Sequence, residues 1–378
     1  MELVVHKDDL LPELQLIQGI VERKNTIPIL ANVLFKAKTN DVEMRATDLE
    51  VALFSSCAAK VKKSGVVTLP AKTLFEVVRA LPETNITIKQ QGQNTVMVEA
   101  ETTKGKKFIS SMQTLPEEDF PTLAEPKTKQ AVKLPGQPLR EMIARTKFAI
   151  TGEDTRYFLN GALFFKDASE MTMVGTDGHR LALVSMKSIK SGKSPKNPDV
   201  ARVIFPKKTL QELSSLLTDN DKEISYQEEE NHLFFNVGGR TLISRKVDAQ
   251  FPAYERVIPK DSDKAVEFER DRLNQAIKRV ALLSNERSSA VTFKISNDVV
   301  DITSSRQDVG EASEKIEVEY GGDSVQICLN AKYVLDFLSI VETDNVRLEF
   351  KNETSQAVMQ PVGAEGYQYT YVIMPMRI

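Results

Sequence analysis

Apolar positions recur along the chain with two different periods. Six segments carry an apolar residue at every third or fourth position, which is typical of helices with one buried face. The spacing predicts helices over 8–24, 71–81, 137–147, 206–217, 270–283 and 330–341. Between them lie short runs in which apolar and polar residues alternate, such as Ile86/Ile88 and Val96/Val98. This second pattern predicts half-buried antiparallel strands.

The predicted elements occur three times in the same order. From Leu10 and from Leu139, a helix and two strands lead to a Thr-Asp pair whose threonine lies 37 positions on. The later part of each copy also matches: VVTLPAKTLFEVVRAL at 66–81, RVIFPKKTLQELSSLL at 202–217 and QICLNAKYVLDFLSIV at 326–341. Such regular self-similarity indicates internal triplication. We expect three tandem α+β domains, each with two helices on antiparallel sheets, over 1–127, 128–262 and 263–378.

Composition places the chain among globular proteins. Of its 378 residues, 41% are hydrophobic and 27% are charged, which excludes a disordered chain. No apolar run is long enough for a membrane span, and no secretory signal is visible at the start. Cys57 and Cys328 lie far apart and predict free thiols in a reducing cytoplasm. With only three histidines besides, we expect no metal site.

Charge is unevenly distributed. The net charge is −3, yet the six predicted helical segments together carry +5 and the remainder −8. A shared helix surface would be basic and would attract a phosphate backbone without reading sequence. Few aromatic residues accompany these cations, so duplex DNA fits better than a single strand. Ordinary solvated helix faces explain the charge equally well. The candidate DNA-facing residues are Lys24, Lys72, Arg79, Arg140, Arg145, Lys147, Lys207, Lys208, Arg272, Lys278, Arg279 and Lys332.

Leu282 breaks the pattern of the fifth helix. On a helical wheel it lies opposite the apolar stripe of Leu273, Ile277 and Val280. An apolar residue on a polar face indicates contact with another chain. A single exposed leucine is also common, and this pattern alone slightly favours that simpler explanation.

The segment Thr176-Asp177-Gly178-His179-Arg180 is the strongest catalytic candidate. Aspartate and histidine together can act as acid and base, so a hydrolase using Asp177 and His179 is one alternative. However, no nucleophile elbow of the G-x-S-x-G kind is present, and the equivalent segment at 47–50, TDLE, has no histidine. A hairpin turn accounts for the Thr-Asp-Gly sequence. Phosphate-binding glycine loops are absent as well. We expect no enzyme and no cofactor.

Several motifs along the whole chain resemble one family, the beta subunit of bacterial DNA polymerase III, or sliding clamp. They are TIPIL at 26–30, RYFLNG at 156–161, TDGHRL at 176–181, FPAY at 251–254, LSNE at 283–286 and VIMPMRI at 372–378. The resemblance implies a DNA clamp that forms a ring as a head-to-tail homodimer. Such a ring encircles duplex DNA, with helices inside, and tethers the replicative polymerase in the nucleoid. A monomeric duplex-binding module that never closes is a further alternative.

The resemblance also implies a groove between the second and third domains. There the polymerase, the clamp loader and repair proteins insert short linear peptides, each with an apolar anchor. Its implied wall comprises Arg156, Leu159, Thr176, Gly178, His179, Arg180, Leu181, Pro252, Arg256, Val257, Asn330, Tyr333, Met374, Pro375, Met376 and Arg377. The implied subunit contact comprises Phe108, Leu282 and Leu283. Two positions, Glu153 and Ser288, depart from the family pattern.

Overall fold

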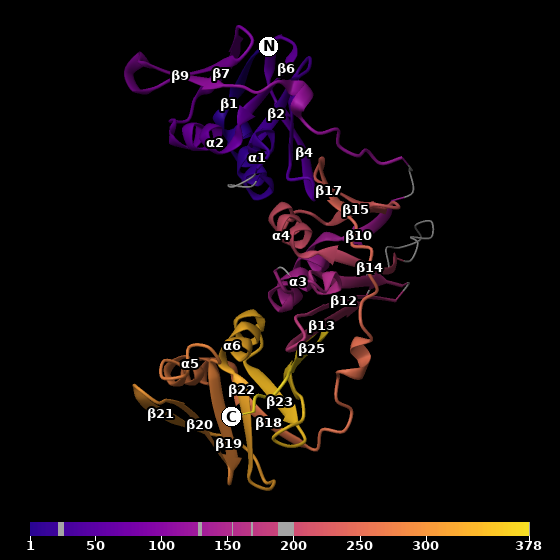
Figure 1. The fold of residues 1–378 in the computed structure, drawn as a ribbon, viewed down its shortest axis with the longest axis vertical. Coiled ribbons are helices and arrows are strands. Elements are labelled where there is room, and N and C mark those ends of the chain that lie inside the picture. Colours follow the sequence, from indigo (N-terminus) through magenta and orange to yellow (C-terminus); the bar gives the residue numbers. More distant parts are fainter. Residues whose placement is uncertain (22–25, 128–130, 153, 168, 188–199, 378) are drawn as a thin grey trace. The chain divides into compact units, whose positions relative to one another are not determined.

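The structure consists of two compact units. This computed structural model describes residues 1–21, 26–127, 131–152, 154–167, 169–187 and 200–377. Unit 1 comprises Met1–Gln137 and Lys208–Lys246, and unit 2 comprises Pro138–Lys207 and Val247–Ile378. Each unit has its own helices and antiparallel sheets (Figure 1).

All six predicted helices are present, with ends shifted by a few positions. They are α1 (Lys7–Ile20), α2 (Ala71–Ala80), α3 (Gly136–Thr146), α4 (Lys207–Leu216), α5 (Arg270–Ala281) and α6 (Ala331–Ile340). The predicted apolar stripes face inward: Leu10, Leu14 and Ile17 of α1, for example, are fully buried. The predicted end of the first helix, at residue 24, lies outside the described residues. None of the described helices has the length and apolarity needed to cross a bilayer.

Unit 1 contains two sheets, with strand orders β5-β1-β7-β8-β9 and β10-β15-β16-β17-β4-β3-β2-β6. Their strands are β1 (Glu2–His6), β2 (Asn32–Ala37), β3 (Asp41–Thr47), β4 (Val51–Ala58), β5 (Lys60–Lys63), β6 (Gly65–Pro70), β7 (Asn85–Gln91), β8 (Thr95–Glu101), β9 (Lys107–Gln113), β10 (Val132–Pro135), β15 (Glu223–Glu228), β16 (His232–Val237) and β17 (Arg240–Arg245). The larger sheet is continuous because β17 pairs with β4, from Thr241 opposite Phe54 to Ser244 opposite Val51. We call this ladder, with the side chains packed on it, the first junction.

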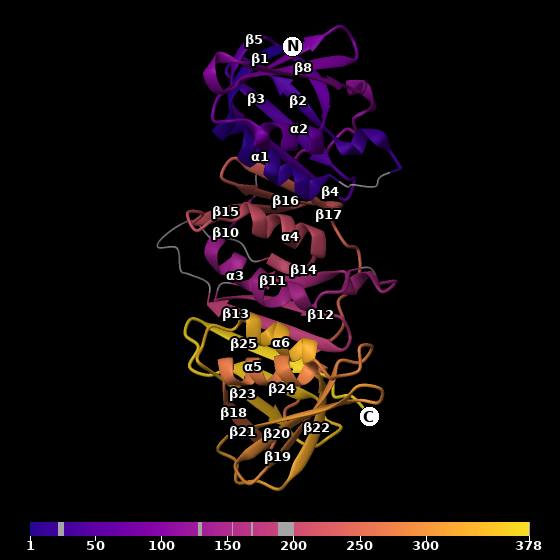
Figure 2. The same cartoon turned by 90° about the vertical axis from the view of Figure 1, so that its left-hand side faces the viewer.

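Unit 2 also contains two sheets, with strand orders β14-β11-β12-β13-β25-β24-β23-β18 and β21-β20-β19-β22. Their strands are β11 (Gly161–Lys166), β12 (Glu170–Thr176), β13 (Arg180–Lys187), β14 (Val200–Pro206), β18 (Lys264–Glu269), β19 (Ala290–Ser296), β20 (Val299–Arg306), β21 (Gly310–Glu317), β22 (Val325–Asn330), β23 (Asn345–Phe350), β24 (Ala357–Pro361) and β25 (Tyr367–Ile373). Here β13 pairs with β25, from Arg180 opposite Ile373 to Met186 opposite Tyr367. We call this ladder, with the side chains packed on it, the second junction. Figure 2 shows α5 and α6 side by side in front of the strands.

The element order repeats three times, as the sequence predicts. Each copy runs strand, helix, strands, helix and three strands, and the first copy has one additional strand, β5. The predicted central domain, 128–262, contributes strands to both units because it completes both eight-stranded sheets. The predicted domain boundaries themselves stay predictions.

Candidate functional site

The turn between β12 and β13 is held by its own threonine and aspartate. The Thr176 hydroxyl donates to the carbonyl oxygen of Arg180 at 2.6 Å and accepts from the Gly178 N–H at 3.1 Å. One carboxylate oxygen of Asp177 accepts from the N–H groups of His179, at 2.9 Å, and Arg180, at 3.0 Å. Gly178 has a φ of +88°, which glycine adopts without strain. This confirms that Thr-Asp-Gly closes a hairpin.

Arg156 lies against this turn. Its backbone and guanidinium N–H groups donate to the Asp154 carboxylate, at distances of 2.7 to 3.0 Å. These hydrogen bonds lower the pKa of Asp154 to about 2. A Cβ atom added to Gly178 would lie 3.4 Å from Nη1 of Arg156, in van der Waals contact with the guanidinium. The structure thus brings together Arg156 and Gly178, as the resemblance implies.

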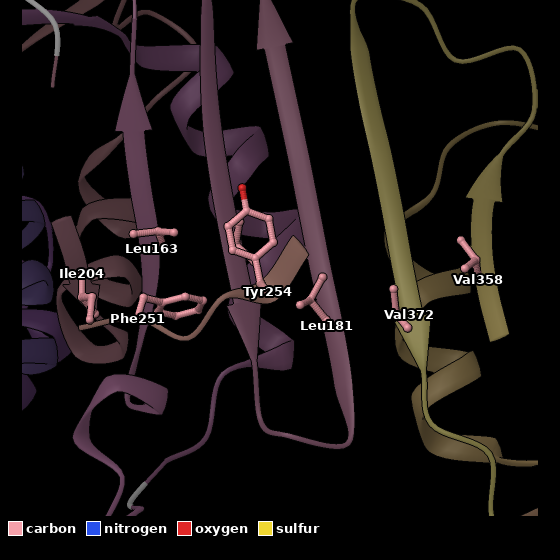
Figure 3. Close-up of a cluster of buried hydrophobic side chains, with 8 residues drawn as sticks. Leu163, Leu181, Ile204, Phe251, Tyr254, Val358 and Val372 are labelled. Carbon is pink, nitrogen blue, oxygen red and sulfur yellow. The ribbon is translucent and has the colours of Figure 1, made fainter. Parts of the chain in front are cut away.

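An apolar cluster covers the neighbouring strands of the second junction. Figure 3 shows one side chain of the cluster on each of β14, β11, β13, β25 and β24, with Phe251 and Tyr254 of the 251–254 segment lying on them. The buried members are Leu163, Val174, Leu181, Ile204, Phe251, Tyr254, Val358 and Val372. Val257 packs against the cluster and is only partly buried. Two implied wall residues, Leu181 and Val257, therefore belong to one apolar surface.

The C-terminal segment after β25 crosses the end of the same junction. The Met374 N–H donates to the carbonyl oxygen of His179 at 2.9 Å, and the Met376 N–H donates to that of Cys328 at 2.8 Å. The Met374 side chain is 37% exposed. Nearby, the Asn330 side chain caps α6 by accepting from the N–H groups of Lys332 and Tyr333. The tail is thus tied to the turn at 177–179 and to β22.

Arg180 points into the protein and is 8% exposed. Nε donates to Asp177 at 3.0 Å, Nη1 to Asp336 at 2.5 Å and to the Tyr371 hydroxyl at 3.3 Å, and Nη2 to the carbonyl oxygen of Phe148 at 2.6 Å. Burial alone would lower the pKa of Arg180, but the oxygens of Tyr371, Asp336 and Asp177 outweigh it and raise this pKa. The guanidinium stays charged and is held from every side.

The other implied wall residues differ in exposure. Leu159 is buried in a short 3-10 turn, Tyr157–Leu159, whereas Pro252 and Arg256 are exposed beside the cluster. Arg377 is exposed, and Pro375 is half-buried. Glu153 lies outside the described residues. The carbonyl oxygen of Ser288 accepts from the Asn330 side-chain amide at 3.0 Å. The peptide-binding role of the whole set stays a prediction.

The predicted DNA-facing residues fall into distinct groups. Those with exposed side chains are Lys72, Arg79, Arg272, Lys278, Arg279 and Lys332, and those that are half-buried are Arg140, Lys147, Lys207 and Lys208. Arg279 pairs with Glu314 at 2.5 Å, and Lys208 pairs with Asp48. The paired carboxylates weaken the electrostatic attraction of both cations for a phosphate backbone. Burial lowers the pKa of Lys207, whose ammonium donates to the carbonyl oxygen of Ile150. Lys24 lies outside the described residues.

The prediction for Arg145 is wrong. This residue is 4% exposed, so it cannot face DNA. Its guanidinium lies 4.1 Å from the ring centre of Tyr367 and pairs with Glu141 at 2.9 Å. The periodicity of α3 did place Arg145 away from the buried stripe, but β25 covers that side of the helix. Only the tertiary pairing of β25 with β13 brings this strand there.

Leu282 directly follows α5 and is 78% exposed, which confirms that it lies off the buried stripe. Phe108, on the edge strand β9, and Leu283 are half-buried. The subunit contact that the resemblance implies for these three residues stays a prediction. The sequence motifs gave no indication of Asp336 and Tyr371, which both bind the Arg180 guanidinium at the second junction. The tyrosines that alternate along the strand, at 367, 369 and 371, could have indicated a buried polar contact there.

Family models match the chain in three consecutive stretches. The N-terminal, central and C-terminal domains of the DNA polymerase III beta subunit match residues 1–124, 133–253 and 255–377. The beta sliding clamp of Pseudomonas putida is 36% identical over 380 residues, and that of Escherichia coli K12 is 33% identical; both alignments cover each chain completely. This chain belongs to the DNA polymerase III beta subunit family. Its predicted α+β fold of three tandem clamp domains is confirmed.

Solved structures of this family have the same fold over their whole length. The sliding clamp of Pseudomonas aeruginosa bound to griselimycin has a TM-score of 0.89 at 34% identity, and that of Bartonella birtlesii has 0.90 at 29%. Both matches cover each chain completely. The chain is therefore a DNA sliding clamp, and neither the hydrolase nor the open monomeric module is supported. In the hydrolase alternative Asp177 would have served catalysis, but its carboxylate binds the backbone and Arg180.

Proposed function

We propose that two copies of this chain close head to tail into a ring around duplex DNA and tether the replicative polymerase to its template. The observation that carries this proposal is the exposure of cations on α2, α5 and α6 in a chain whose net charge is −3. Mildly basic helices hold a phosphate backbone loosely and without sequence preference. Because the closed ring is linked topologically to DNA, tight binding is unnecessary. The proposal assigns no catalytic step to any residue.

The site that binds partner proteins lies at the second junction. Here the polymerase, the clamp loader and repair proteins insert short peptides with an apolar anchor, next to Leu181, Val257 and Met374. Support comes from the partly exposed apolar surface and from the segment after β25, which is bound to the turn at 177–179 through Met374. Methionine side chains adapt to several shapes, so one pocket can accept several partners. We place this activity in the cytoplasm, at the nucleoid.

The first test is the mass in solution at micromolar concentration, measured by light scattering. A closed two-subunit ring gives about twice the chain mass of 42.3 kDa. Replacing Leu282 and Leu283 together by lysine buries charge at the proposed contact and yields monomers. Tyr157→Lys is the control, because Tyr157 is 72% exposed and lies outside the proposed contact. A monomeric parent protein, or an unchanged dimer in the double variant, would contradict the ring or this contact.

The second test compares retention on two DNA substrates. Loaded onto a nicked circle, the ring stays bound through a salt wash and is lost when the circle is linearised. A module that never closes binds circle and linear DNA equally, with a strong dependence on salt. Equal retention would therefore overturn the encircling ring.

A further inference from the structure

Arg180 connects two elements that are far apart in the sequence. It begins β13, and its guanidinium binds Asp336 on α6 and the hydroxyl of Tyr371 on β25. It also lies between two rings, 4.3 Å from the centre of Tyr333 and 5.3 Å from that of Phe148. With each of its three nitrogens already donating, Arg180 is poorly placed to bind the polar end of a peptide.

Tyr371 extends this network to the peptide wall. Its hydroxyl donates to the carbonyl oxygen of Tyr333 at 3.1 Å, and its ring stacks on Phe337 with centres 5.3 Å apart. Tyr333 is therefore held at its backbone by Tyr371 and at its ring by Arg180. The same arginine starts the strand that follows His179, whose carbonyl oxygen holds the tail at Met374. Arg180 is thus connected to two parts of the proposed wall: to Tyr333 on α6 directly, and to Met374 through the neighbouring residue His179.

Among the residues that the structure describes, the first junction has a different set of contacts. Aligning the copies at Thr47 and Thr176 places Val51 in the position of Arg180, and aligning the helix starts places Glu212 in that of Asp336. Glu212 lies close against Gly19 of α1. The cation nearby is Lys208, which comes from α4 and binds Asp48 and the carbonyl oxygen of Ile20. At the first junction Lys208 therefore connects α4 to α1 and to the turn at Asp48.

We propose that Asp336 and Tyr371 are positioning residues for partner-peptide binding: together with Arg180 they hold Tyr333 and the turn at 177–179 in the arrangement that a peptide recognises. This inference rests on the proposed function of the second junction. It assigns to this network the part of the proposed docking surface formed by Tyr333 and the turn. Neither residue needs to touch the peptide, because both act through Arg180 and Tyr333.

The test measures the affinity of a fluorescent peptide that carries the clamp-binding segment of the replicative polymerase. Asp336→Asn keeps the size of the side chain but removes the charge that faces Arg180, and we expect about tenfold weaker binding. Tyr371→Phe removes only the hydroxyl, and we expect a loss of about threefold. Asp336→Glu retains the charge and should recover part of the affinity. The matched control is Glu212→Gln, at the equivalent position of the first junction, which should leave the affinity unchanged.

A double-mutant cycle separates positioning from general destabilisation. If Asp336 acts through Tyr333, Asp336→Asn causes no further loss of affinity in a Tyr333→Ala background. An additional tenfold loss there, or unchanged affinity of Asp336→Asn and Tyr371→Phe alone, would overturn the inference. Removing residues 374–378 tests the proposed function separately: if that variant still binds the peptide fully, the site itself is wrong. If the truncated chain loses affinity for the peptide but Asp336→Asn does not, only the positioning role is refuted.

Discussion

The two junctions share one backbone plan and differ in the polar groups built onto it. In both, a threonine hydroxyl donates to the carbonyl oxygen four residues on: Thr47 to Val51 at 2.9 Å and Thr176 to Arg180 at 2.6 Å. In both, the next residue is an aspartate that accepts from two backbone N–H groups. The third turn position is Leu49 in one and Gly178 in the other, and both have positive φ, +78° and +88°.

Their ion pairs lie in different places. At the first junction, Arg240 of β17 binds Glu13 of α1, a carboxylate that is 5% exposed. The residue equivalent to Arg240 at the second junction is Tyr369, a buried side chain whose hydroxyl donates to the carbonyl oxygen of Arg145 at 2.8 Å. Turn chemistry and strand pairing therefore set a framework that both junctions share. The side chains placed on that framework differ, and the proposed docking surface depends on those of the second junction.

The largest expected effect comes from removing residues 374–378, the segment that follows β25 at the second junction. We expect peptide affinity to fall by at least about 100-fold, because the apolar anchor loses one wall of its pocket. The fold should survive, since β25 ends at Ile373 and its ladder remains. Fluorescence anisotropy with the labelled peptide measures the loss. Leu49→Ala, in the turn of the first junction, is the control with unchanged affinity, and full binding by the truncated chain would contradict the assignment.

The next effect concerns stability at the first junction. Arg240→Met leaves the buried Glu13 carboxylate without its partner and should lower the free energy of unfolding by about 3 kcal/mol. Tyr369→Phe at the second junction removes one hydrogen bond and should cost about 1 kcal/mol. Urea unfolding measures both. Replacing Glu13 and Arg240 together by methionine should restore most of the loss; equal destabilisation by the single and double variants would show that the charge is not the cause.

Exchanging the third turn residue probes the shared backbone. Gly178→Ala forces a Cβ atom into a positive-φ position beside Arg156, so we expect a loss of about 1–2 kcal/mol in unfolding free energy. Leu49→Gly relieves strain but loses apolar contact and chain stiffness, and should stay within about 1 kcal/mol of the parent. Thermal unfolding compares the pair. A more stable Gly178→Ala variant would argue against a strained turn.

The smallest effect is a pH dependence confined to the second junction. Hydrogen bonds from Arg156 hold the pKa of Asp154 at about 2, below the ordinary value of about 3.9. Because this pKa is lowered by folding, the stabilisation is present above pH 4 and disappears as pH falls through 2. An NMR titration of the carboxyl group measures it, and Arg156→Gln should return the pKa to its ordinary range. The first junction has Ile27 in place of Arg156 and lacks this ion pair. A pKa near 4 in the parent protein would refute the paired geometry.

Much of the fold could be predicted from local patterns. Six apolar stripes located six helices, and Thr-Asp pairs marked two equivalent hairpin turns, because these features depend on residues close in sequence. The candidate wall of the docking surface came from motifs that resemble a family. Asp336 and Tyr371 were missed because their role depends on a contact with Arg180 across more than 150 positions.

The sequence by itself determined the repeat, the elements of each copy, the turns between strands and the excess of positive charge on the helices. Local hydrogen bonding and the period of apolar residues are sufficient for these. Tertiary structure alone decided which strands join the copies, and therefore which polar side chains meet. Arg145 illustrates the reason: its place on α3 predicts exposure, but the pairing of β25 with β13 brings Tyr367 over its guanidinium. Burial and charge pairing depend on packing between distant segments, which a local pattern does not encode.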